Sequence, residues 1–124
     1  MSQDETGILK SRDYFFSLIN DEISSGIPSN RIVFGGFSQG AGMSLVNGIT
    51  FPQKLGGIYC LSGYLLLQKS LLEGKYGASE SPNKETPMFM GHGSADPMVK
   101  YEWAVKSRDA LVEKGWNVEL KVYP

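Results

Sequence analysis

The sequence has few of the residues that build disulfides and metal sites. Its 124 residues include one cysteine, Cys60, and one histidine, His92. A single cysteine excludes a disulfide within the chain and fits a reducing compartment. One cysteine and one histidine are also too few for a zinc site built from these two residue types. We therefore expect no metal site.

The chain also lacks long apolar runs and an excess of one charge. No stretch approaches the roughly eighteen uninterrupted apolar residues of a membrane-spanning helix, and the start has no signal-peptide pattern. The 12 Lys and Arg nearly balance the 13 Asp and Glu, without a basic stripe. We therefore expect neither stable membrane insertion nor nucleic-acid binding. The expected location is the cytoplasm, and the nucleus stays open as a second compartment.

What is present is an alternation of helical and strand-like patterns. Apolar residues at spacings of three and four predict helices over residues 4–25, 38–49 and 98–115. Short apolar or alternating runs predict strands over residues 31–36, 54–63, 87–93 and 116–124. The polar stretch 73–87, rich in Gly, Ser and Pro, is the nearest thing to a linker.

This alternation predicts an α/β fold with a mostly parallel sheet. The middle strands are continuously apolar, which predicts burial on both of their faces. Catalytic groups of such sheets lie in the loops after the carboxyl ends of the strands. Four polar residues, Ser38, Ser62, His92 and Asp96, come just after expected strands.

The segment from Gly36 to Gly40, Gly-Phe-Ser-Gln-Gly, matches the pattern G-x-S-x-G. In a nucleophile elbow this pattern holds the serine on a strained strand-to-helix turn with its hydroxyl exposed. Ser38 is then the nucleophile, and the backbone N–H of Gln39 supplies half of an oxyanion hole. The alternative is a glycine-rich turn in which Ser38 only caps the helix. The predicted strand, turn and helix favour the elbow.

A serine nucleophile needs a base and an acid, which follow it in the order acid, then histidine, in this fold class. Asp96 is the expected acid, and its alternative role is a helix N-cap before Pro97. No histidine follows Asp96 in the chain. His92 ends an apolar strand, so we expect it to be packed or bonded to backbone, and we expect Cys60 to be a buried small residue.

Three separated segments, "GIPSNRIVFGGFSQGAGMSL", "KLGGIYCLSGYL" and "PMFMGHGSADPMV", resemble the acyl-protein thioesterases in the phospholipase/carboxylesterase group of α/β-hydrolases. The resemblance implies one partial α/β-hydrolase domain over residues 1–124. It also implies a cofactor-free serine hydrolase that cleaves palmitoyl-type thioesters on S-acylated proteins and carboxylic esters such as lysophospholipids.

Carried over residue by residue, the resemblance makes Ser38 the nucleophile, Gln39 the oxyanion donor and Asp96 the acid. The segment "LSGYL" matches a region near the acyl groove, which makes Leu61, Tyr64 and Leu65 candidate groove residues. Leu66 stands where many relatives have proline, so the shape of this loop does not follow from the resemblance.

Two family features have no match in the sequence: the early strands with a Gly-rich oxyanion loop, and the segment carrying the catalytic histidine. We therefore expect a hydrolase domain truncated at both ends, with an exposed edge strand near Ile32 and little activity of its own. One alternative is a non-catalytic remnant that binds acyl lipids or proteins. Another is a different small α/β-hydrolase carboxylesterase, although "GFSQG" together with "LSGYL" favours the thioesterase group.

Overall fold

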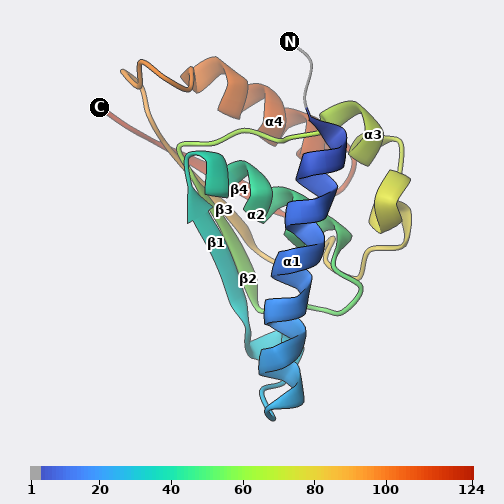
Figure 1. Cartoon of the computed structure of the whole chain (residues 1–124). Coiled ribbons are helices and arrows are strands. Elements are labelled where there is room, and N and C mark those ends of the chain that lie inside the picture. Colours follow the sequence, from blue (N-terminus) through green and yellow to red (C-terminus); the bar gives the residue numbers. More distant parts are fainter. Residues whose placement is uncertain (1–3) are drawn as a thin grey trace.

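The computed structural model describes residues 4–124, so the first three residues of the expected domain lie outside the described residues. Helices and strands alternate along most of the chain (Figure 1). In chain order the elements are α1 (Glu5–Ser24), β1 (Val33–Phe37), α2 (Gln39–Thr50), β2 (Gly57–Leu61), α3 (Gln68–Leu72), β3 (Met88–Gly93), α4 (Tyr101–Glu113) and β4 (Val118–Tyr123). Two 3₁₀ turns, η1 (Ser29–Arg31) and η2 (Lys75–Glu80), lie between them.

The four strands form one parallel sheet in the order β1-β2-β3-β4. The register places Phe34 beside Ile58, Ile58 beside Met88, and Met88 beside Val118. The α/β fold predicted from the sequence is therefore confirmed. Because all strands run the same way, their carboxyl ends, and the turns that follow them, lie along one edge of the sheet.

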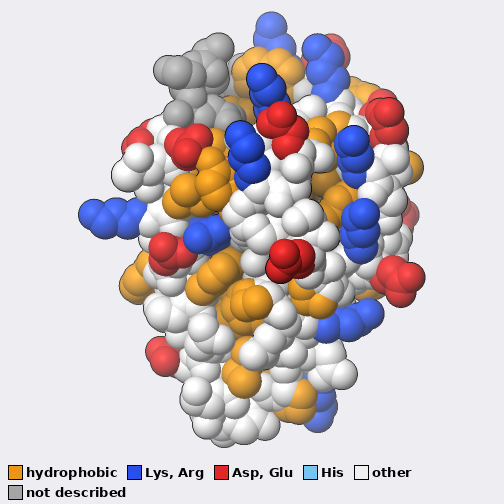
Figure 2. All heavy atoms as spheres, turned by 90° about the vertical axis from the view of Figure 1, so that its right-hand side faces the viewer, with side chains coloured by type: hydrophobic (Ala, Val, Ile, Leu, Met, Phe, Trp, Pro, Cys, Tyr) orange, Lys and Arg blue, Asp and Glu red, His pale blue; other side chains and the backbone are white. Residues whose placement is uncertain are grey.

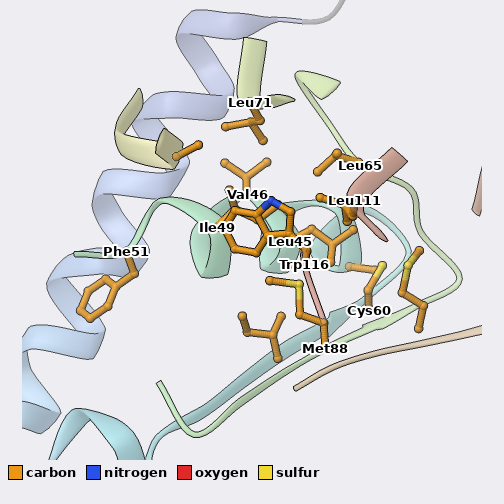
Figure 3. Close-up of a cluster of buried hydrophobic side chains, with 14 of the residues drawn as sticks. Leu45, Val46, Ile49, Phe51, Cys60, Leu65, Leu71, Met88, Leu111 and Trp116 are labelled. Atoms are coloured by element: carbon orange, nitrogen blue, oxygen red, sulfur yellow. The ribbon is translucent and has the colours of Figure 1, made fainter. Parts of the chain in front are cut away.

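The helices lie on one side of this sheet, with α2 between β1, β2 and the outer helix α1 (Figure 1). Figure 2 shows that this outer side carries charged side chains interspersed with hydrophobic ones. Between helices and sheet lies a single buried cluster that includes Leu45 and Ile49 of α2, Leu111 of α4, and Met88 of β3. Trp116 lies at the centre of this cluster (Figure 3).

No helix among the described residues covers the opposite face of the sheet. Alternate strand residues point there, and large apolar side chains among them remain exposed, including Val33 at 63%, Phe37 at 69% and Tyr59 at 40%. The prediction that the middle strands are buried on both faces is therefore wrong within this chain. The expected exposed edge strand is confirmed, since β1 has a neighbour on one side only.

The interpretation of residues 73–87 as linker-like is also wrong. This stretch contains η2 and packs against the domain through the buried residues Ala78, Asn83 and Thr86. The Asn83 side chain accepts hydrogen bonds from Leu55 N (2.8 Å) and Thr86 Oγ1 (2.8 Å), and it donates to the carbonyls of Phe51 (3.3 Å) and Gln53 (3.0 Å). The side chains of Asn83 and Thr86 therefore bond to the protein rather than to water.

Replacing Asn83 with alanine should lower the free energy of unfolding by about 3 kcal/mol, because buried groups such as the Leu55 N–H lose their partner. Urea unfolding followed by circular dichroism measures the change. The matched control is Ser79→Ala, at an exposed position of the same loop, which should change stability by less than about 0.5 kcal/mol. Equal effects of the two substitutions would contradict the structural role of Asn83.

Candidate active site

Ser38 occupies a sharp turn between the end of β1 and the start of α2. Its backbone has φ 57° and ψ −115°, a conformation that costs a non-glycine residue about 1–3 kcal/mol and is concentrated at functional sites. The turn is fixed from both sides: Ser38 N donates to Leu61 O (2.8 Å), and Ser38 O accepts from Ala41 N (3.0 Å). The strained strand-to-helix geometry agrees with the elbow interpretation.

The Ser38 side chain does not cap α2. Although Ser38 is at the N-cap position, its hydroxyl forms no capping hydrogen bond, and the residue is exposed. The first N–H groups of a helix have no acceptor within the helix, so the Gln39 N–H at the start of α2 is available beside this hydroxyl. The positive end of the α2 dipole also lies here, so the local electrostatic potential favours a negatively charged oxygen at Ser38.

The two glycines that flank Ser38 play different roles. A Cβ atom built on Gly36 would lie 2.3 Å from the carbonyl oxygen of Gly40, which is rigid helix backbone. A Cβ atom built on Gly40 would meet nothing within 4 Å. Only Gly36 is therefore required for the close approach of strand and helix that forms the turn.

Asp96 lies in the turn between β3 and α4. Its Oδ1 atom accepts hydrogen bonds from Met98 N (2.9 Å) and Val99 N (3.0 Å). The N–H groups of Val99 and Met98 hold the pKa of the Asp96 carboxyl below its usual value, and His92 contributes in the same direction. The carboxylate therefore stays ionised at neutral pH and organises its own turn.

His92 is sealed within the protein, with an exposure of 1%. Its Nε2 atom lies 2.7 Å from the carbonyl oxygen of Val99, so this nitrogen carries the hydrogen and donates it. The other ring nitrogen, Nδ1, is buried and has no hydrogen-bond partner among the described residues. The expectation of a histidine bonded to backbone is confirmed. Neither ring nitrogen is positioned to take a proton from an exposed serine.

The sequence also predicts that Cys60 is a buried small residue. This prediction is confirmed, since Cys60 is fully buried on β2. Burial raises the pKa of its thiol to about 12, so the thiolate is not formed at neutral pH. Within residues 4–124 no group of three or more His, Cys, Asp and Glu side chains could hold a metal ion. None of the helices described is both long and apolar enough to cross a bilayer.

A hollow of about 440 Å³, here called the Ser38 pocket, opens beside the serine. Its polar lining includes Ser38 and Gln39, and its apolar lining is Ile8, Tyr64, Leu66, Met98, Val99 and Trp103. The turn that carries Asp96 thus reaches the pocket through the two residues that bond to its carboxylate. The pocket joins an exposed serine hydroxyl, the N–H groups at the start of α2 and an apolar wall.

The three candidate groove residues lie in different places. Tyr64 lines the Ser38 pocket, whereas Leu65 is a core residue with 2% exposure and Leu61 ends β2 beside Gly91. Strand alternation explains the position of Leu61: its neighbour Cys60 points into the core, so Leu61 points to the uncovered face. Neither Leu61 nor Leu65 lines the Ser38 pocket.

Sequence reasoning missed the pocket residues Met98, Val99 and Trp103. The predicted helix over residues 98–115 begins only at Tyr101, because the Asp96 carboxylate binds the backbone N–H groups ahead of it. Trp103 lies on α4 but is 36% exposed. The buried side of α4 is formed by Ala104, Ser107 and Leu111 instead.

The sequence profile of the phospholipase/carboxylesterase family matches residues 1–124. The chain belongs to this family. The fold resemblance agrees with the match: the crystal structure of Arabidopsis thaliana SOBER1 superposes with a TM-score of 0.85 at 29% identity, covering 99% of this chain and 57% of that chain. The α/β-hydrolase class expected from the sequence is thereby confirmed.

Several of the proteins that this chain resembles bear the name acyl-protein thioesterase. Acyl-protein thioesterase 1 of Neurospora crassa is 52% identical over 123 residues, which are 99% of this chain and 49% of that protein. The crystal structure of Zea mays acyl-protein thioesterase 2 superposes with a TM-score of 0.80 at 28% identity, covering 99% of this chain and 59% of that chain. This family member thus spans about half the length of the curated relatives it matches.

Proposed function

We propose that this chain forms the nucleophile-bearing half of a serine hydrolase of the acyl-protein thioesterase type. Its substrates are palmitoyl-type thioesters on S-acylated proteins and carboxylic esters such as lysophospholipids. Ser38 attacks the acyl carbonyl, the thiol or alcohol leaves, and water then releases the acyl group from Ser38. The Gln39 N–H stabilises the oxyanion, and Asp96 orients a histidine base other than His92. We further propose a cytoplasmic location, with the nucleus as a second compartment.

The observation that carries the proposal is the strained turn at Ser38, which opens into an apolar pocket. A hydroxyl that capped a helix would need neither the positive φ nor the pocket. The 52% identity to a protein named acyl-protein thioesterase 1 supports the thioester as substrate. The oxygen ester follows from the same chemistry, because the attack on the carbonyl and the oxyanion are common to both.

The test is a graft in which residues 1–124 replace the matching segment of the Neurospora crassa relative. We expect the graft to hydrolyse a palmitoylated peptide thioester faster than a short-chain ester of the same concentration. Release of the peptide thiol and of the alcohol are measured in parallel. A folded graft that hydrolyses neither substrate would refute the proposal, and a graft that prefers short esters would assign the chain to another carboxylesterase type.

The 124-residue chain by itself supports a second candidate function, acyl binding without turnover. The observation that favours it is the state of His92, whose Nε2 is bonded to Val99 O inside the protein. Intact mass after treatment with a fluorophosphonate should show no adduct on the isolated chain, while a fluorescent fatty-acyl ligand should still bind. An adduct that disappears in Ser38→Ala would instead show that the serine is activated without a second histidine.

A further inference from the structure

A second hollow adjoins the Ser38 pocket on the side of α3 and α4. Its volume is about 390 Å³, and sites for small molecules commonly fall at about 300–1,000 Å³. Its walls are Tyr64, Leu65, Gln68, Lys69, Trp103 and Lys106. We call it the lysine pocket, because two cationic side chains line it together with aromatic and aliphatic ones. Lys69 lies on α3 and Lys106 lies on α4, so the two lysines come from different helices.

The two pockets share one wall, the aromatic pair Tyr64 and Trp103. Their rings make an edge-to-face contact with centroids 5.3 Å apart. The buried hydroxyl of Ser107 fixes this wall, since it accepts from Leu65 N (2.8 Å) and donates to Trp103 O (2.9 Å). A ligand that lies over Tyr64 and Trp103 can therefore occupy both pockets, and it does not have to order this wall when it binds.

The charge of the lysine pocket is not neutralised by neighbouring side chains. Neither Lys69 nor Lys106 takes part in the ion pairs found among residues 4–124. Each has a glutamate four residues away, Glu73 just after α3 and Glu102 on α4, but neither glutamate lines the pocket. Glu73 lies 3.9 Å from Lys75 instead. The pocket therefore offers two ammonium groups to a ligand.

We infer that the lysine pocket binds the anionic group, a phosphate or a carboxylate, of an ester whose reacting carbonyl lies at Ser38. This inference rests on the proposed function for the position of the carbonyl. Lysine ammonium groups bind phosphate and carboxylate oxygens as charged donors, and the aromatic wall contacts the apolar stem of the ligand. Because both lysines are exposed, salt should weaken the interaction.

The test compares matched ligands on the 124-residue chain: octanoylglycerol, its phosphate monoester and its hemisuccinate. Binding is followed by the fluorescence of Trp103 and by the backbone amide NMR signals of Gln39 and Gly42 in the Ser38 pocket. We expect the phosphate ester to bind about tenfold more tightly than the neutral ligand in dilute buffer, a difference that about 0.5 M NaCl removes. Tight binding of the hemisuccinate as well would extend the ligand class to carboxylates.

The double variant Lys69→Gln/Lys106→Gln should remove the advantage of the anionic ligands and leave the affinity for octanoylglycerol unchanged. The control is Lys10→Gln/Lys54→Gln, which makes the same change in net charge at exposed positions outside both pockets. Equal loss in both variants, or equal affinity of the anionic and neutral ligands for the natural chain, would overturn the inference. Far-UV circular dichroism confirms that each variant is folded.

The binding test involves no reaction, so it separates this inference from the proposed function. If the anionic ligands bind through the lysines while the graft fails to hydrolyse any ester, the proposed function is wrong and the anion site stands. If the graft hydrolyses esters but the lysine variants bind normally, only the anion site is wrong.

Discussion

Gly36→Ala should lower the free energy of unfolding by at least about 4 kcal/mol, because its new methyl group overlaps helix backbone that cannot move aside. The overlap is with the carbonyl group of Gly40, whose oxygen would be 2.3 Å from the added Cβ. Relief would require β1 and α2 to separate at the turn that holds Ser38. Urea unfolding measures the effect, and loss of a cooperative transition is the extreme form of it.

Gly40→Ala is the matched control, since it adds the same methyl group four residues later in the same motif. The space there is open and the residue is helical, so alanine should raise the free energy of unfolding by up to about 1 kcal/mol. Alanine should therefore lower the free energy of unfolding at Gly36 and raise it at Gly40. Destabilisation of similar size at both positions would show that the turn does not depend on the close approach at Gly36.

The largest effects on activity are expected in the graft of residues 1–124 into the Neurospora crassa relative. Ser38→Ala should lower kcat for thioester hydrolysis by about 10⁶ and Asp96→Asn by about 10⁴, the losses typical of serine triads. Asparagine keeps an oxygen for the N–H groups of Met98 and Val99, so this substitution removes the charge while the turn is retained. Steady-state kinetics on a palmitoylated peptide measures both losses.

Ser62→Ala is the control for the nucleophile. Ser62 follows β2 as Ser38 follows β1, it also has a positive φ, of 59°, and its N–H bonds to the next strand in the same way. It does not line the Ser38 pocket, so kcat should be unchanged. A loss at Ser62 as large as that at Ser38 would contradict the assignment of the nucleophile.

The sequence contained enough information to predict the strand, turn and helix around Ser38, because that signal is local. Glycines on both sides of one serine end a strand, and an apolar helical pattern resumes within a few residues. The position of Asp96 after β3 was predictable for the same reason. The expectation that His92 bonds to backbone also came from its immediate neighbours, an apolar strand leading into the residue.

The failures of prediction concern contacts between distant residues. Asn83 bonds to Leu55, 28 residues earlier, so its polar neighbours in sequence gave no sign that it is buried. The start of α4 depends on a competition between the helix and the Asp96 side chain for the same N–H groups, which apolar periodicity does not register. Whether the face at Tyr59 is exposed depends on which segments pack against the sheet, and the composition of a strand does not specify this.

The order of the strands in the sheet, β1-β2-β3-β4, is also their order in the chain. Each strand therefore pairs with the strand that the ribosome has synthesised just before it. Once β2 has emerged it can dock on β1 through α2, and β3 and β4 can add in turn without displacing an earlier partner. The turn that holds Ser38, between β1 and α2, can thus form together with the β1–β2 pair, before Asp96 has been synthesised.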